Sequence, residues 1–170
     1  MLDFNFYSPT KFYFGREREK EVGKILKEFG AQRVLLHSSG GSSEKSGLMD
    51  RVRRAMDAEN IYYVELKGVV PNPRLSLVRE GIELCRKEQL DFVLAVGGGS
   101  VADSAKAIAL GVHYEGDVWA FYSKGIKAGK VLPIGTIITL AATGSEASNS
   151  SVITNTDDPD NWIKTGFNAD

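Results

Sequence analysis

The chain is poor in cysteine and histidine, the residues of disulfides and of most transition-metal sites. It has one cysteine and two histidines in 170 residues. The single thiol, Cys85, cannot form an internal disulfide, and we expect it to be a small core residue rather than a catalytic nucleophile. His37 and His113 do not stand at a metal-ligand spacing such as H-x-x-x-H, so we expect no metal site in this chain.

Charge and hydropathy exclude two further classes of protein. The 21 basic and 22 acidic residues give a net charge of −1 and are mixed along the chain, which argues against a nucleic-acid partner. No apolar run approaches the length of a membrane span, and the first residues lack the apolar core of a signal peptide. We therefore expect a soluble, cytoplasmic protein without a membrane partner. Its hydrophobic content of 42% is sufficient for the core of one domain.

The apolar pattern alternates between strands and helices. Buried strands are expected at residues 33–37, 61–66 and 92–96. Helices are expected at residues 17–29 and 75–88, in the segment that follows the third strand and runs to about residue 111, and in the segment whose apolar side includes Leu48, Val52 and Met56. Helical connections of this length join parallel strands. The sequence therefore predicts an α/β fold: a Rossmann-like parallel sheet with helices on both faces.

The remaining segments carry weaker patterns. We expect an edge ribbon or two short strands in residues 5–15, a flexible hydroxyl-rich loop at 38–43, a short turn or helix at 117–122, an extended segment at 131–140, a strand at 151–154, and a polar tail without a complete helix at 155–170. Ligands of parallel sheets lie outside the carboxyl ends of the strands. The loops after His37 and Val96 should therefore face one crevice.

A triple glycine, Gly97-Gly98-Gly99, joins the most apolar strand to an alanine-rich helix. Glycine permits backbone dihedrals closed to other residues and lets a ligand approach closely. Ser100 is a good N-cap, and free N–H groups at a helix start favour a phosphate. The turn thus predicts a pyrophosphate site, with a tight turn without ligand as the alternative. It matches G-x-G-x-x-A but lies too late in the chain for the standard Rossmann layout.

A second loop suggests which dinucleotide is bound. The stretch from Ser38 to Ser43 has no Asp or Glu that could accept hydrogen bonds from ribose hydroxyls and repel a 2′-phosphate. Ser39, Gly40 and Ser42 would offer donors instead, so NADP(H) is expected in preference to NAD(H). A solvated loop is the alternative. Asp103 either makes a polar contact at the nicotinamide end or complements the helix dipole, and it can pair with Lys106.

Five segments together resemble the iron-containing (group III) alcohol dehydrogenases, and within them the NADP(H)-dependent butanol dehydrogenase branch. The segments are Phe12-Tyr13-Phe14-Gly15, Gly40-Gly41-Ser42, Pro71-Asn72-Pro73, the run from Gly97 to Lys106, and Ala142-Thr143-Gly144-Ser145-Glu146. The resemblance implies the N-terminal domain fold of these and the dehydroquinate synthase-like proteins. It places Gly98, Gly99 and Ser100 on the pyrophosphate, and Asp103 near the nicotinamide. It also places Thr139 and Thr143 on the adenine and phosphate side, Ser39, Gly40 and Ser42 on the 2′-phosphate, and Lys164 at the nicotinamide ribose.

The resemblance also implies a second half that this chain lacks. Family members carry the ligands for iron or zinc in a C-terminal helical domain, where the metal polarises a small alcohol or aldehyde for hydride transfer. We therefore expect residues 1–170 to be one dinucleotide-binding domain, with no catalytic residue and no metal ligand of its own. The resemblance thus implies an NADP(H)-dependent alcohol or aldehyde oxidoreductase. The alternatives to this assignment are an inert dinucleotide-binding module and a relative of glycerol dehydrogenase or dehydroquinate synthase. A homodimer is left open.

Overall fold

A parallel sheet organises the computed structural model of this chain, which describes residues 9–160 and 162–169. Its strands are β1 (Arg33–Ser38), β2 (Tyr62–Lys67), β3 (Phe92–Gly97) and β4 (Ile134–Ile138). The helices are η1 (Arg18–Glu21), α1 (Val22–Glu28), α2 (Gly41–Lys45), α3 (Leu48–Ala58), α4 (Leu75–Lys87), α5 (Gly99–Gly111), α6 (Trp119–Lys124) and η2 (Ser145–Ala147). A separate antiparallel pair consists of β5 (Ser150–Asn155) and β6 (Ile163–Asn168).

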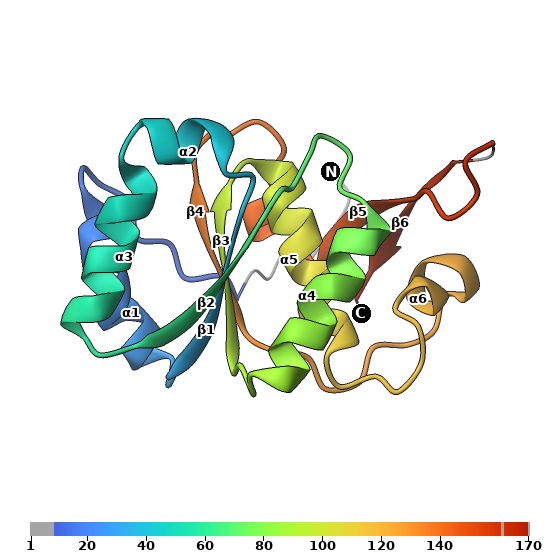
Figure 1. Cartoon of the computed structure of the whole chain (residues 1–170), viewed down its shortest axis with the longest axis horizontal. Coiled ribbons are helices and arrows are strands. Elements are labelled where there is room, and N and C mark those ends of the chain that lie inside the picture. Colours follow the sequence, from blue (N-terminus) through green and yellow to red (C-terminus); the bar gives the residue numbers. More distant parts are fainter. Residues whose placement is uncertain (1–8, 161, 170) are drawn as a thin grey trace, which may run out of the picture.

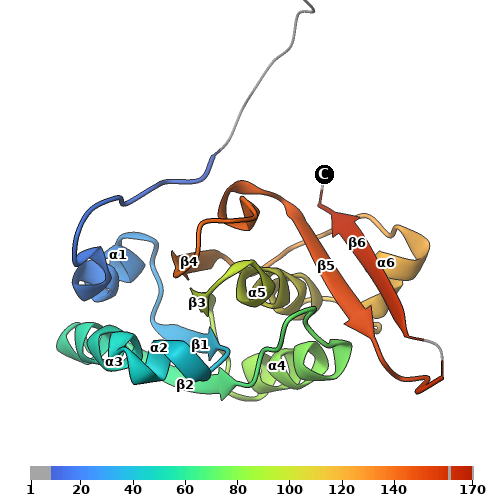
Figure 2. The same ribbon diagram turned by 90° about the horizontal axis from the view of Figure 1, so that it is seen from above.

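The strand order β2-β1-β3-β4 places β1 and β3 side by side at the centre of the sheet (Figure 2). Both pairings of β1 are parallel, with His37 opposite Leu66 on one side and opposite Ala95 on the other. The chain passes from β1 outward to β2 and then crosses back to β3, so the strand order reverses at β1. In open α/β sheets ligands bind at such a reversal, outside the carboxyl ends of the strands. The expected α/β parallel sheet is confirmed.

Helices cover both faces of the sheet, and each face has its own core (Figure 1). Successive side chains of a strand point to opposite faces. Val34 and Leu36 therefore pack with residues of α1 and α3, whereas Leu35 packs with residues of α4 and α5. Every residue of β3 is buried, as a central strand between two helical layers requires. The rigid sheet thus fixes the positions of the loops at its carboxyl edge.

The strands expected in residues 5–15 are absent from the part of this segment that the structure describes. Residues 9–15 contain no strand, and residues 5–8 of the expected ribbon lie outside the described residues. The expected helix at 17–29 is present as η1 followed directly by α1. Lys11 and Tyr13 hydrogen-bond to Glu28 at the end of α1, so the described part of this segment is tied to a helix by side chains.

The polar tail forms a strand that the sequence analysis missed. In β6, Thr165 and Phe167 turn towards the protein while their neighbours are exposed, and Phe167 meets the rings of Phe121 and Tyr122 at centroid distances of 5.5 and 5.8 Å. The hairpin is joined to the start of α4 by a hydrogen bond of 2.9 Å from the Thr154 N–H to the Pro73 carbonyl. Within the described residues, no helix combines the length and the apolar character needed to cross a membrane.

Candidate dinucleotide site

The triple glycine joins β3 to α5 with very little room for side chains. A Cβ at Gly97 would clash with the side chain of Val101, and one at Gly99 would clash with the side chain of Thr143. At Gly98 a Cβ would meet nothing within 4 Å. None of the three glycines has a positive φ, so the expectation of dihedrals closed to other residues is wrong. Glycine is required at two positions by packing, and at the middle one it leaves the backbone uncovered.

The uncovered backbone lies at the amino-terminal end of α5. Gly98 occupies the N-cap position with an extended backbone, and no side chain caps the helix. The expectation that Ser100 is the N-cap is therefore wrong, since Ser100 is the second residue of α5 and is half-buried. The first N–H groups of a helix have no acceptor within it and carry the positive end of its dipole. Together with the open space over Gly98, they offer the donors and the room that an anionic group would need, and we refer to this position as the anion seat.

The loop after β1 is the neighbouring part of this edge, and it is more ordered than expected. Gly40 has φ 84° and ψ −96°, a conformation that glycine alone adopts readily, and α2 begins at the next residue. The predicted flexible loop is thus a short turn into a helix. The buried Ser38 hydroxyl accepts a hydrogen bond of 3.3 Å from the Gly40 N–H, whereas Ser39 and Ser42 are exposed.

The carboxylate nearest to this loop is already engaged. Arg53 and Lys67 each approach Glu44 to 2.6 Å, and Arg53 also binds Glu65 at 2.6 Å. The hydrogen bonds from Arg53 and Lys67 lower the pKa of Glu44 to about 2. These contacts fasten α2 to α3 and β2, and they hold the negative charge of Glu44 in an ion-pair network.

A third segment, residues 139–145, completes the edge next to the glycine turn. The Thr139 N–H donates a hydrogen bond of 3.0 Å to the Gly97 carbonyl, so this residue continues the path of β4 beside the end of β3. Thr143 is exposed, its side chain lies against Gly99, and its hydroxyl accepts a hydrogen bond of 3.3 Å from the Ser145 N–H. Two of the predicted site residues therefore meet the turn from a segment about 40 positions later in the chain.

Behind the turn, α5 is fastened to this segment by a polar network that the sequence analysis did not foresee. The Asp103 carboxylate accepts hydrogen bonds from the Ser145 hydroxyl at 2.6 Å and from the Val152 N–H at 3.1 Å. The Lys106 ammonium donates to the Ser145 carbonyl and hydroxyl and to the Ser150 carbonyl. The expected Asp103–Lys106 pair is present only at 3.9 Å. Asp103 and Lys106 thus make shorter contacts with this loop than with each other.

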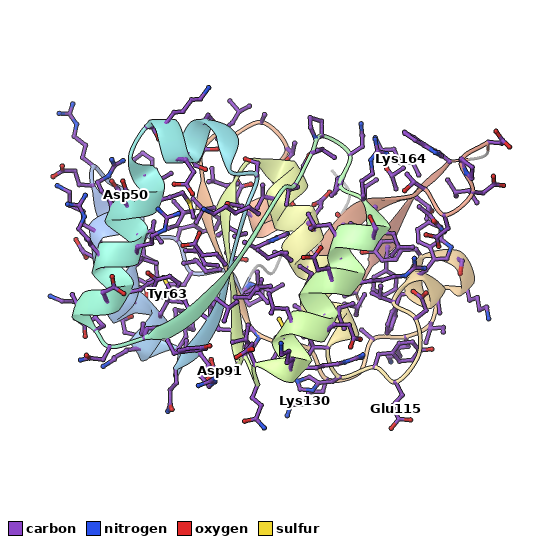
Figure 3. The ribbon with its side chains drawn as sticks, viewed as in Figure 1. Asp50, Tyr63, Asp91, Glu115, Lys130 and Lys164 are labelled. Atoms are coloured by element: carbon purple, nitrogen blue, oxygen red, sulfur yellow. The ribbon has the colours of Figure 1, made fainter. Side chains whose placement is uncertain are left out.

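Lys164 makes its hydrogen bond with a segment other than the glycine turn. It extends from β6, and its ammonium donates a hydrogen bond of 2.6 Å to the Asn72 side-chain oxygen. Figure 3 shows Lys164 on the side of the carboxyl edge and Asp91 at the opposite edge of the sheet. The structure therefore brings Lys164 to the Pro71-Asn72-Pro73 segment that follows β2.

The cysteine and one histidine are structural, and the other histidine is exposed. Cys85 is buried in the core, whereas His113 is exposed. His37 donates through Nδ1 to the Leu66 carbonyl and accepts through Nε2 from the Ser104 hydroxyl, both at 2.9 Å. Burial lowers the pKa of His37 to about 4, so the ring is neutral near neutral pH. In residues 9–160 and 162–169 no three His, Cys, Asp or Glu side chains gather to hold a metal, so these residues do not fit the implied iron or zinc.

Two hollows of the surface lie away from the glycine turn. One, of about 560 Å³, is lined by residues at the amino-terminal edge of the sheet, including Lys27, Arg33 and Tyr62. The other, of about 290 Å³, lies beyond the end of β2 and is lined by residues that include Gly68 and Arg74. The glycine turn lines neither. The strand ends and the helix start, by contrast, supply the free hydrogen-bond donors of this edge.

Comparisons with known proteins found similar chains. A family model described as iron-containing alcohol dehydrogenase matches residues 9–169. The chain is 50% identical over 155 residues to the Probable NADH-dependent butanol dehydrogenase 2 of Bacillus subtilis (strain 168), covering 91% of this chain and 40% of that protein. It is 35% identical over 156 residues to the NADPH-dependent aldehyde reductase YqhD of Escherichia coli (strain K12), covering 90% of this chain and 39% of that protein.

A solved structure shows the same fold. The crystal structure of NADH-dependent butanol dehydrogenase A from Thermotoga maritima superimposes with a TM-score of 0.94 at 42% identity. This match covers 99% of the present chain and 42% of that one. The chain therefore spans about two fifths of the length of the relatives it matches.

Proposed function

This chain belongs to the iron-containing alcohol dehydrogenase family, and on that premise we propose that it is the dinucleotide-binding part of an alcohol or aldehyde oxidoreductase. The observation that carries the proposal is the uncovered backbone of Gly98 at the start of α5, where a Cβ would meet nothing within 4 Å. A ligand phosphate can approach such a backbone as closely as its own van der Waals radius allows.

Each predicted site residue has a role in this proposal. The N–H groups of Gly98, Gly99 and Ser100 bind the pyrophosphate, and Thr139 and Thr143 flank it on the adenine and phosphate side. Ser39, Gly40 and Ser42 bind the adenosine ribose and its substituent. Asp103 and Lys164 serve the nicotinamide side, Asp103 through the loop that it holds. When bound, the nicotinamide supplies the acceptor or donor of hydride.

We propose NADP(H) rather than NAD(H) as the preferred dinucleotide. Residues 38–43 contain no carboxylate, and the negative charge of Glu44 is held by Arg53 and Lys67. A 2′-phosphate at Ser39 and Ser42 would therefore meet hydroxyl and N–H donors without an opposing free carboxylate. Of the three relatives described above, two are named NADH-dependent and one is named NADPH-dependent. Parallel fluorescence titrations with NADPH and NADH decide this point, and tighter NADH binding would overturn the preference.

The catalytic metal belongs to another part of the whole protein in this proposal. We propose that residues 1–170 form one dinucleotide-binding domain and that the ligands for iron or zinc lie in a helical domain outside it, because the described residues gather no such cluster. The substrate would be a small alcohol or aldehyde, and the chain alone would bind cofactor without turnover. A cytoplasmic location, favoured by the lone cysteine, stays a prediction.

The decisive experiment fills the space over Gly98. Gly98→Ala adds one methyl group at an extended position that any residue can adopt and that touches no other atom of the protein. We expect an unchanged melting temperature and an affinity for NADPH at least about tenfold lower. Gly129→Ala is the matched control, because its Cβ also meets nothing within 4 Å and its φ is not positive. Wild-type affinity in Gly98→Ala would refute the assignment of this turn to the pyrophosphate.

A further inference from the structure

The side chain of Lys106 is unusual for a lysine because it is enclosed by the protein. It projects from the second turn of α5, and only 14% of the side chain is exposed. Its ammonium has three N–H donors. They donate hydrogen bonds to the Ser145 carbonyl at 2.6 Å, the Ser145 hydroxyl at 2.8 Å and the Ser150 carbonyl at 2.7 Å. Every one of these acceptors belongs to the segment that follows Thr143.

The charge of Lys106 is balanced by two carboxylates on different elements. Asp103 lies one turn earlier on α5 at 3.9 Å, and Glu146 belongs to η2. Burial lowers the pKa of Lys106, while the negative charges of Asp103 and Glu146 act in the opposite direction. Removing the ammonium would leave two carbonyls and a hydroxyl without their donor in a partly buried place, which is costly.

The network reaches the glycine turn through Ser145. The Ser145 hydroxyl accepts from Lys106 and donates to Asp103 at 2.6 Å, and its N–H binds the Thr143 hydroxyl at 3.3 Å. Thr143 in turn lies against Gly99, where a Cβ would clash with it. A continuous path of contacts therefore runs from Lys106 to the backbone that forms the anion seat.

We propose that Lys106 is a positioning residue that holds residues 143–150 against the glycine turn and thereby sets the affinity for the dinucleotide pyrophosphate. The proposal rests on the proposed function, because it assumes that this turn binds a dinucleotide. Lys106 itself does not line the anion seat, since its three donors are used by the loop.

The test compares three variants with the wild-type chain. Lys106→Met keeps the length and the apolar stem of the side chain but removes the ammonium. Ser145→Ala removes the hydroxyl relay while the lysine keeps its two carbonyl acceptors. Lys130→Met is the matched control, because Lys130 is exposed at the opposite edge of the sheet (Figure 3) and the same charge is lost.

Binding of NADPH and of adenosine 2′-monophosphate, which carries no 5′-phosphate and so has no group for the anion seat, is measured by titration below the melting temperature of each variant. For Lys106→Met we expect NADPH affinity to fall about tenfold, and for Ser145→Ala about threefold, while the 2′-monophosphate loses less than about twofold. Amide exchange in residues 143–150 should be faster in both variants. Lys130→Met should match the wild type in every measurement.

The outcomes separate this inference from the proposed function. Wild-type NADPH affinity in both variants, or an equal loss for the two nucleotides, would overturn the positioning role. Should Lys106→Met not fold, Ser145→Ala decides alone, because the lysine remains paired there. If the wild-type chain binds neither NADPH nor NADH, the proposed function fails and the positioning role fails with it.

Discussion

Lowering the pH should destabilise this protein through one buried imidazole. His37 lies fully buried between the sheet and α5, with both ring nitrogens engaged as neutral groups. A proton on Nε2 would force the Ser104 hydroxyl to change from donor to acceptor and would place a charge in the core. Desolvation accordingly lowers the pKa of His37 to about 4 from an ordinary value of 6.5.

The sign and size of the effect follow from these two pKa values. Between them the unfolded chain binds the proton and the folded chain does not, so the free energy of unfolding falls as the pH falls. The full difference corresponds to about 3 kcal/mol, of which about 2 kcal/mol is lost between pH 7 and pH 5. With a urea m-value of about 2 kcal/mol/M, the unfolding midpoint should move down by about 1 M.

The assay is urea unfolding followed by circular dichroism at the two pH values, for the wild-type chain and for His37→Gln. Glutamine supplies an NH₂ donor group and a carbonyl acceptor but does not titrate, so the His37→Gln variant should be less stable at pH 7 and nearly insensitive to pH. His113→Gln is the control, because His113 is exposed and its removal should leave the wild-type pH dependence intact. Equal pH dependence of the wild type and His37→Gln would refute the reasoning.

Two further predictions concern packing. Gly23→Ala should lower the unfolding free energy by about 2 kcal/mol or more, because its Cβ would overlap the Ala55 carbonyl where α1 meets α3. Thermal denaturation of Gly23→Ala and of the control variant Lys24→Ala, whose side chain is exposed, measures this loss of stability. Equal melting temperatures of the two variants would contradict the close packing. Burial raises the pKa of the Cys85 thiol to about 12, so a maleimide should label it only in denaturant. Rapid labelling of the native chain would contradict its burial.

The sheet and the glycine turn were predictable because their signals are local. An apolar run followed by glycines and an alanine-rich helix predicts β3 and α5 without knowledge of the rest of the chain. The family resemblance, carried by five short segments, is confirmed by the match over residues 9–169. The weaker local signals of β6 were available too: Ile163, Thr165 and Phe167 alternate with less apolar residues, as in a half-buried strand.

What could not be predicted depends on residues far apart in the sequence. Serine and glycine favour a loop at 38–43, yet α2 forms there with Glu44 bound to Arg53 and Lys67 from other elements. The helical pattern identified Lys106 only as a partner of Asp103, three residues away. Its principal acceptors at Ser145 and Ser150 lie about 40 positions later, beyond the reach of any periodicity.

The lysine network also has a consequence for anyone who would transplant this nucleotide-binding module into another scaffold. The parallel sheet ends at Ile138, which makes the end of β4 a natural-looking place to cut. A module cut there would keep Lys106 and Asp103 on α5 but discard the carbonyls, hydroxyl and N–H that satisfy them between residues 145 and 152. The smallest unit that can be transferred therefore extends through β5. Without β5, helix α5 would carry the charges of Lys106 and Asp103 into the new scaffold without their hydrogen-bond partners.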